Sequence, residues 1–393
     1  MSDIDRKTEG GREVKIVSAI DSFKGSMTSL EVSEAFEKGV RKIYKDAEFI
    51  KVSLADGGEG TVQALIDNTN GKLVKLKVNG PLMSETEAFY GILEDGETAV
   101  IEMAAASGLP LLSQEERNPM EATTYGTGEL IKDAIKNGCR EFIIGIGGSA
   151  TNDGGMGMLS ALGYVFLDKE GNELFPSGKN LSKVDSFDET KAMKELSECK
   201  FLIACDVDNP FYGKSGAAHV YGRQKGASDE MILELDNGLE NFSKVINKIR
   251  NIDISNVAGA GAAGGLGGAF MAFLNSDLKP GIDIIIQKVG LEEYLKDTDY
   301  VITGEGRIDF QSAMGKTPTG VAKLAKKYNI PVIAIGGSVA DDIENIYECG
   351  ISAVFSIMDS PMTLKEAMNT EKSLKLVEKT AEQIFRLLGT CKK

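Results

Sequence analysis

The stretch EFIIGIGGSATNDGG, residues 141–155, decides the fold class of this 393-residue chain. Its first six residues, EFIIGI, form a short apolar run that is typical of a buried β-strand. The glycines that follow are typical of a tight turn, because glycine adopts positive backbone φ angles without strain. We therefore predict a strand, then a glycine-rich loop, then a helix.

The same order of an apolar run and a small-residue loop recurs along the chain. The other predicted strands are residues 14–20, 49–54, 98–104, 201–205, 300–303, 331–335 and 353–357. Amphipathic helical patterns occupy residues 28–44, 229–249 and 364–388. This alternation predicts an α/β protein with a largely parallel sheet, in which ligands bind beyond the carboxyl ends of the strands.

Domain boundaries are weakly marked. Residues 72–91 alternate apolar and polar side chains, which predicts an antiparallel hairpin and interrupts the strand–loop–helix order. That order resumes near Gly290. One interpretation is a doubly wound domain built from both ends of the chain, with a second domain inserted into it.

Composition excludes several function classes. The chain has 44 basic and 59 acidic residues and a net charge of −15, which disfavours general binding of nucleic acids or anionic membranes. With five cysteines, no CxxC pair and a single histidine, His219, a disulfide framework, a zinc site or a histidine-based catalytic triad is not expected. The N-terminus has no apolar signal region, so we expect a cytoplasmic protein.

Two glycine-rich loops are candidate phosphate sites. In residues 147–152, backbone N–H groups and the side chains of Ser149, Thr151 and Asn152 offer donors, although a tight turn alone would also explain the glycines. Residues 259–265 match GxGxxG, but residues 252–257 before them make a poor strand, which weakens a dinucleotide-binding interpretation. A phosphate cradle and close helix packing both remain open for this second loop.

A third loop only resembles a phosphate-binding motif. Gly315, Lys316 and Thr317 match the end of a P-loop, but Phe310 stands where the first glycine is required. We therefore do not expect P-loop chemistry.

Charged side chains gather after the predicted strands. The carboxylates are Asp21, Asp56, Glu59, Asp206, Asp208, Glu305 and Asp309, and the cations are Lys24, Arg223, Lys225 and Arg307. Carboxylates at one sheet edge can hold Mg²⁺ or accept a hydroxyl proton, and nearby cations can neutralise a transferring phosphoryl group. Together with the glycine loops, this set indicates phosphoryl transfer.

The sequence closely resembles the bacterial type I glycerate kinase family. The matching segments, in family order, are DSFKGS (21–26), ADGGEGT (55–61), IEMAAASGL (101–109), TYGTGELI (124–131), GIGGSATNDGG (145–155), ACDVDNP (204–210), GAGAAGG (259–265) and TGEGRID (303–309). Arg223 stands where the family usually has proline, and Phe310 where a small residue is more usual.

The resemblance implies two α/β domains with an active site between them. One is Rossmann-like and built from both chain ends, and the other is inserted into it. The corresponding boundaries are residues 14–78 plus 290–393 for the first domain and 79–289 for the second, with residues 1–13 as a flexible extension. The implied activity is a kinase that uses ATP and Mg²⁺ on D-glycerate and generally forms 2-phosphoglycerate. The 3-phospho product is the alternative, and a homodimer is left open.

We assign roles to individual residues as hypotheses. The catalytic candidates are Asp206, Asp309, Lys24 and Arg307, with Asp206 favoured as general base and Asp206 and Asp309 as Mg²⁺ ligands. The substrate-binding candidates are Asp21, Ser22, Lys24, Asp56, Glu59 and Arg307. The ATP-binding candidates are Gly147, Gly148, Ser149, Ala150, Thr151, Asn152, Gly261, Gly264 and Gly265.

Two other function classes are weighed against the kinase. An NAD-dependent hydroxy-acid oxidoreductase would use the 259–265 loop for its cofactor, and a strand before Gly259 would favour it. A non-catalytic ligand sensor would not need the acidic set Asp21, Asp56, Asp206 and Asp309. Both are weaker interpretations than a kinase.

Overall fold

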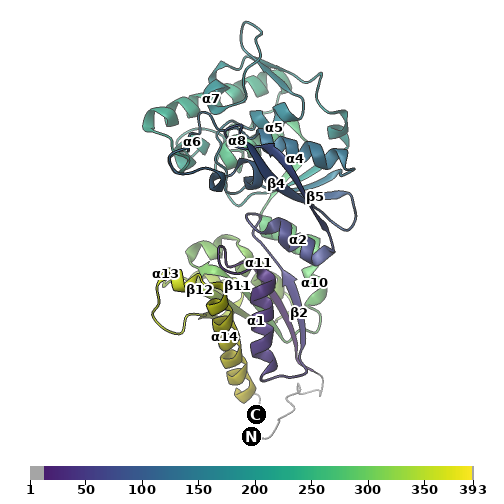
Figure 1. The fold of residues 1–393 in the computed structure, drawn as a ribbon, viewed down its shortest axis with the longest axis vertical. Helices are drawn as coiled ribbons and strands as arrows, with labels where there is room; N and C mark the ends of the chain where they lie inside the picture. The colour runs from purple at the N-terminus through teal and green to yellow at the C-terminus, as the bar shows by residue number, and fades with distance from the viewer. Residues whose placement is uncertain (1–12, 392–393) are drawn as a thin grey trace. The chain divides into compact units, whose positions relative to one another are not determined.

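The computed structural model describes residues 13–391, so the predicted extension at residues 1–13 lies, except for Glu13, outside the described residues. The chain is an α/β protein that divides into two compact units (Figure 1). Unit 1 contains residues 1–56 and 282–393, and unit 2 contains residues 57–281. Among the described residues, every helix is too short or too polar to cross a lipid bilayer.

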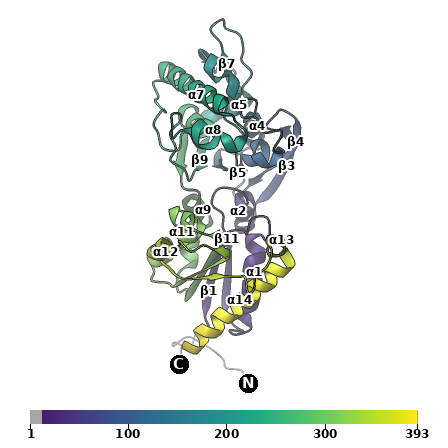
Figure 2. The same ribbon diagram turned by 90° about the vertical axis from the view of Figure 1, so that its left-hand side faces the viewer.

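Unit 1 is built around a five-stranded parallel sheet in the order β13-β12-β11-β1-β2. Its strands are β1 (Lys15–Ile20), β2 (Glu48–Ser53), β11 (Tyr300–Ile308), β12 (Val332–Val339) and β13 (Ile351–Ser356). Its helices are α1 (Ser29–Arg41), α9 (Gly281–Val289), α10 (Leu291–Tyr294), η5 (Phe310–Met314), α11 (Thr317–Lys326), α12 (Glu344–Glu348), α13 (Leu364–Ala367) and α14 (Thr370–Cys391). Helices α1 and α14 cover one face of the sheet, and α11 and α12 lie on the other (Figure 2).

Unit 2 contains a six-stranded mixed sheet in the order β10-β9-β6-β5-β4-β3. Its strands are β3 (Lys72–Asn79), β4 (Glu85–Ile92), β5 (Thr98–Glu102), β6 (Glu141–Gly145), β9 (Lys200–Ala204) and β10 (Ser276–Lys279), with β7 (Val165–Leu167) and β8 (Ser186–Asp188) as a separate hairpin. Its helices are α2 (Thr61–Thr69), α3 (Ala104–Ser107), η1 (Leu109–Leu111), α4 (Tyr125–Lys136), α5 (Met156–Ala161), η2 (Gly178–Lys183), η3 (Lys194–Glu198), α6 (Ala217–Tyr221), η4 (Arg223–Lys225), α7 (Asp229–Arg250) and α8 (Ala262–Phe273).

The unit boundaries differ from those expected from the sequence. The sequence places them after residue 78 and before residue 290, whereas the contacts divide the chain after Asp56 and before Ile282. The physical reason is that β3 pairs with β4 along its full length, from Lys72–Ile92 to Asn79–Glu85. Strand β3 therefore belongs to the sheet of unit 2, and α2 before it contacts β4 and β5 of that sheet.

Helices α1 and α14 pack closely through a glycine. A Cβ atom at Gly39 would lie 2.2 Å from the backbone oxygen of Glu378 and 2.7 Å from the Cβ atom of Ala381. Around this contact, Phe36 and Tyr44 meet the ring of Phe385 edge to face. The two helices come from opposite ends of the chain, so this contact ties the two segments of unit 1 together.

We predict that Gly39→Ala destabilises the protein by about 1–3 kcal/mol, because the new methyl group overpacks the α1–α14 contact. This loss should outweigh the gain in helix propensity that alanine normally brings. The measurement is urea unfolding followed by circular dichroism. Lys38→Ala, at an exposed position of the same helix, is the matched control and should change stability by no more than about 0.5 kcal/mol. Equal stability of the two variants would contradict the close packing at Gly39.

Candidate active site

The charged residues of unit 1 meet where the strand order of its sheet reverses. From β1 the chain moves outward to β2, and from β11 it moves in the opposite direction to β12 and β13. The carboxyl ends of β1 and β11 therefore flank a topological switch point, which is the usual ligand position in open α/β sheets. Asp21 and Lys24 follow β1, and Glu305 and Arg307 lie at the end of β11.

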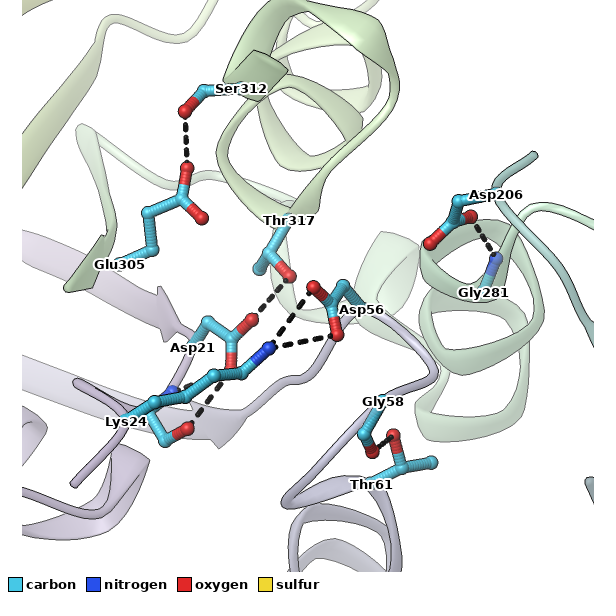
Figure 3. Close-up of polar contacts among 11 residues, drawn as sticks. Asp21, Lys24, Asp56, Gly58, Thr61, Asp206, Gly281, Glu305, Ser312 and Thr317 are labelled. Atoms are coloured by element: carbon cyan, nitrogen blue, oxygen red, sulfur yellow. Dashed lines mark hydrogen bonds and ion pairs between the residues drawn. The ribbon is translucent and has the colours of Figure 1, made fainter. Parts of the chain in front are cut away.

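Asp21 is a buried carboxyl group at this switch point, with only 1% of its surface exposed. One of its oxygens accepts hydrogen bonds from the Ser22 N–H (2.6 Å) and hydroxyl (3.3 Å), and the other accepts one from the Thr317 hydroxyl (3.1 Å) (Figure 3). Burial raises the pKa of Asp21 to about 7, and the neighbouring Asp56 carboxylate adds to this rise while Lys24 opposes it. A carboxyl group with a pKa near neutrality can accept a proton under working conditions.

Lys24 and Asp56 form an ion pair beside Asp21. The Lys24 Nζ atom lies 3.3 Å from Oδ1 and 3.2 Å from Oδ2 of Asp56 (Figure 3). Burial works to lower the pKa of Lys24, but the attraction of Asp56 and Asp21 outweighs it and raises the pKa above its ordinary value. Lys24 therefore stays charged and can attract an anionic substrate to the site.

Glu305 adds a second buried carboxyl group that our residue assignments do not include. It is 8% exposed, and its Oε1 accepts a hydrogen bond from the Ser312 hydroxyl (Figure 3). Burial raises the pKa of Glu305, while the Ser312 hydrogen bond and the charge of Lys316 act against the rise. Its position in TGEGRID, one of the segments that support the family resemblance, was the signal that could have identified it.

These residues surround a cavity of about 670 Å³ in unit 1. Its lining includes the charged residues Asp21, Lys24, Asp56, Glu305, Arg307 and Lys316, together with Ser22. Five of these are predicted substrate-binding residues, and the structure brings them to one site. Glu59, the sixth, is exposed in unit 2.

Arg307 and Asp309 lie next to each other at the end of β11. The Arg307 Nε atom is 3.2 Å from Oδ2 of Asp309, and the Arg307 side chain is largely exposed. The backbone N–H of Asp309 donates to the Ser312 hydroxyl at 3.1 Å, which helps to fix the turn into η5. Arg307 lines the cavity, whereas Asp309 is not among its lining residues.

Asp206 lies in unit 2, in the loop after β9. Its Oδ1 accepts the backbone N–H of Gly281 at 2.9 Å, at the start of α9 (Figure 3). This contact gives Asp206 a structural role as a helix-start acceptor. Within residues 13–391, no three histidine, cysteine, aspartate or glutamate side chains are grouped to hold a metal ion.

A buried lysine stabilises the first glycine loop of unit 2, residues 147–152. Lys225, which is 2% exposed, donates hydrogen bonds from Nζ to the Ser149 hydroxyl (2.8 Å) and to the Thr151 carbonyl (2.6 Å). Gly147 and Gly148 are exposed, whereas residues 149–152 are buried. The predicted phosphate loop therefore has an exposed turn at Gly147 and Gly148, and Lys225 holds the buried residues that follow this turn in place.

Asp153 anchors the other end of this loop. Its carboxylate accepts hydrogen bonds from Thr124 and from the backbone N–H groups of Gly155 and Gly157. Burial raises the pKa of Asp153, although these hydrogen bonds oppose the rise. The side-chain amide of Asn152 and the hydroxyl of Thr151 are buried without a hydrogen-bond partner in the described structure.

The second glycine loop packs against the first. Cβ atoms at Gly261 and Gly264 would lie 2.2 Å from the Pro210 oxygen and 2.1 Å from the Thr151 oxygen, and one at Gly265 would lie 2.8 Å from the Phe211 ring. Residues 252–258, directly before Gly259, form no strand. Close packing thus accounts for these glycines, and the dinucleotide interpretation of residues 259–265 loses its support.

Lys225 should make the stability of the protein depend on pH. Burial lowers its pKa to about 7 in the folded state, against an ordinary value of 10.5. Between these values the unfolded chain binds more protons, so this group makes the free energy of unfolding rise with pH. We predict that Lys225→Met flattens the rise between about pH 7 and about pH 9 in urea unfolding.

The matched control is Lys214→Met, at an exposed lysine of unit 2. It should keep the pH dependence of the wild-type protein. If Lys225→Met instead runs parallel to wild type across this range, Lys225 is charged in the folded state and the assigned titration is wrong.

Comparison with known proteins identifies the family of the chain. Residues 16–389 match the sequence model of the glycerate kinase family. The chain is 51% identical over 354 residues to glycerate 2-kinase of Escherichia coli (strain K12), covering 90% of this chain and 93% of the relative. It is 48% identical over 371 residues to glycerate kinase of Bacillus subtilis (strain 168), covering 94% and 97%.

A solved structure gives the same result. A crystal structure from Salmonella typhimurium LT2 that bears the name glycerate kinase 2 superposes with a TM-score of 0.88 at 46% sequence identity. The match covers 97% of this chain and 99% of that one. The predicted resemblance and the predicted α/β fold are thereby confirmed. The chain belongs to the glycerate kinase family and is an enzyme that phosphorylates glycerate.

Proposed function

We propose that this enzyme transfers the γ-phosphoryl group of ATP to the 2-hydroxyl of D-glycerate, giving 2-phosphoglycerate and ADP. The observation that carries the proposal is the buried carboxyl group of Asp21 beside the Lys24–Asp56 pair at the switch point of unit 1. The name glycerate 2-kinase of the Escherichia coli relative supports the choice of hydroxyl.

In the proposed reaction, Asp21 accepts the proton of the glycerate hydroxyl. The hydroxyl oxygen then forms a bond to the γ-phosphorus, and the bond from that phosphorus to the bridging β–γ oxygen breaks. Asp21 suits this role because its carboxyl group is fixed by Ser22 and Thr317 and titrates near neutrality. We therefore prefer Asp21 to Asp206 as general base, since Asp21 lines the cavity whereas Asp206 is not among its lining residues.

The cations of the cavity compensate negative charge. Lys24, which stays protonated next to Asp56, attracts the glycerate carboxylate or the transferring phosphoryl group. Arg307 and Lys316 line the same cavity and add to this attraction. In unit 2, the exposed turn at Gly147 and Gly148 offers backbone N–H groups to phosphate.

Carboxylates suited to a magnesium ion that arrives with the nucleotide line the cavity, namely those of Asp21, Asp56 and Glu305. Mg²⁺ commonly takes only one or two protein carboxylates, and water and phosphate oxygens fill its other positions. Asp206 in unit 2 and Asp309 in unit 1 remain candidate ligands, each on its own, and we assign no single ion to both. When bound, the ion would neutralise charge on the phosphates.

We predict that Asp21→Asn lowers kcat by a factor of about 10² to 10⁴, because the amide cannot accept the hydroxyl proton. The dissociation constant for MgADP should stay within about twofold, since this change leaves the nucleotide contacts intact. Asp206→Asn, the comparison variant, should instead raise the Mg²⁺ concentration needed for half-maximal rate. Coupled assays of ADP release measure kcat and its Mg²⁺ dependence for both variants, and calorimetric titration measures the MgADP dissociation constant. Normal turnover of Asp21→Asn with loss of kcat in Asp206→Asn would return the role of base to Asp206.

The position of phosphorylation can be read directly from the product. We expect the proton-coupled ³¹P NMR signal of the phosphoester to be a doublet, because phosphorus in 2-phosphoglycerate couples to a single carbinol proton. A triplet from two methylene protons would identify 3-phosphoglycerate and overturn the proposed regiochemistry. A reaction without glycerate is the control and should give no phosphoester signal.

A further inference from the structure

We propose that the apolar half of the unit 1 cavity binds the base of the nucleotide, an adenine or similar flat heterocycle. This inference rests on the proposed function, because it assigns a place to the phosphoryl donor of that reaction. Besides the charged residues of the candidate active site, the cavity is lined by the apolar side chains that we call its apolar half or apolar wall: Phe23, Met27, Ile357, Met358, Met362 and Met368.

The size of the cavity leaves room for a ligand larger than glycerate. Its volume of about 670 Å³ lies in the range of roughly 300–1,000 Å³ that sites for drug-sized ligands occupy. A three-carbon acid would interact with the charged residues and leave the apolar half without contacts. A nucleotide would place its base among the methionines and direct its phosphates toward Lys24 and Lys316, next to the glycerate hydroxyl at Asp21.

The chemistry of the apolar half favours an aromatic ring. Its lining residues carry no charge, so a phosphate or carboxylate placed there would lose its hydration without compensation. Methionine side chains adapt their shape and make favourable sulfur contacts with aromatic rings. Four methionines converge on this half: Met27, Met358, Met362 and Met368.

Contacts between segments that are far apart in the sequence hold the apolar wall together. The Thr370 hydroxyl donates to the Ser26 carbonyl at 2.7 Å, which ties the start of α14 to the loop after β1. Gly25, at a φ of +75°, faces the Met368 methyl group, which lies 3.0 Å from the position of a Cβ atom. A capping box between Thr363 and Glu366 fixes α13 in the same wall. The segment after β13 and the segment after β1 therefore form one binding surface.

The test separates base recognition from phosphate recognition. Ala367 lies on α13 in the cavity wall, so Ala367→Phe would fill the space assigned to the base. Calorimetric titration with MgADP and with magnesium tripolyphosphate, which lacks a base, measures the two contributions. We expect the dissociation constant for MgADP to rise by about tenfold or more, because the base loses its buried apolar contacts. The dissociation constant for magnesium tripolyphosphate should stay within about twofold of the wild-type value.

A second variant keeps the test decisive if Ala367→Phe does not fold. Met362→Gln replaces the thioether by an amide of similar length within the same wall. Met231→Gln makes the same change at a partly buried methionine of α7 in unit 2 and is the matched control. Met362→Gln should weaken MgADP binding about fivefold or more, and Met231→Gln should leave it unchanged.

The outcomes distinguish the two proposals. Unchanged MgADP binding in both cavity variants, or an equal loss of MgADP and tripolyphosphate binding, would overturn the assignment of the base. Wild-type turnover with MgATP and glycerate would leave the proposed function standing in either case. If the wild-type protein neither binds MgADP nor uses MgATP, the proposed function fails, and the assignment of the base fails with it.

Discussion

The structure of unit 1 depends on placing a carboxyl group, Asp21, in a buried position at the end of a parallel strand. Burying an ionised carboxylate is costly unless hydrogen bonds or opposite charge compensate it. Here Ser22 and Thr317 donate hydrogen bonds, and Lys24 supplies a positive charge nearby. The remaining cost appears as a pKa of about 7. A group that would otherwise be permanently charged becomes one that can exchange a proton near neutrality.

The burial of Asp21 also involves segments that are far apart in the sequence. Asp21 comes from the start of the chain, and Thr317 and Glu305 come from the segment that returns after unit 2. The packing of α1 against α14 through Gly39 fixes these segments relative to each other. In unit 2, Lys225 and Asp153 play the comparable part for the glycine loop, where buried ionisable groups hold a turn whose outer residues are exposed. In both units, buried polar groups position exposed ones.

Much of the local structure could be predicted from the sequence, because most of the predicted strands are mainly apolar runs followed by turn residues. All eight predicted strands occur, and the 72–91 hairpin is β3 and β4. The long C-terminal helical pattern is divided into α13 and α14 between Ala367 and Thr370. The unit boundaries were not predictable by pattern, since the alternation of residues 72–91 predicts the β3–β4 hairpin but not that this hairpin joins the sheet of unit 2.

Side-chain convergence across unit 1 was also beyond local pattern. Asp21, Lys24 and Asp56 could be placed at strand ends, but the hydrogen bond from Thr317 and the buried position of Glu305 depend on strand order. The GxGxxG match left two interpretations open, a phosphate cradle and close helix packing. Its glycines satisfy a ligand motif, yet the space at Gly264 is taken by the Thr151 backbone. A glycine motif indicates that another group lies close to the backbone, and only the fold shows whether that group is a ligand or another part of the protein.

The pH dependence of kcat/KM for glycerate tests the central role of Asp21 most directly, because this parameter reports ionisations of the free enzyme. With a base that titrates near neutrality, kcat/KM should rise with pH and level off above an apparent pKa of about 7. The Asp21→Asn variant should show a low rate without this transition. A wild-type profile that is flat between about pH 5 and about pH 9, or an unchanged transition in Asp21→Asn, would contradict the account.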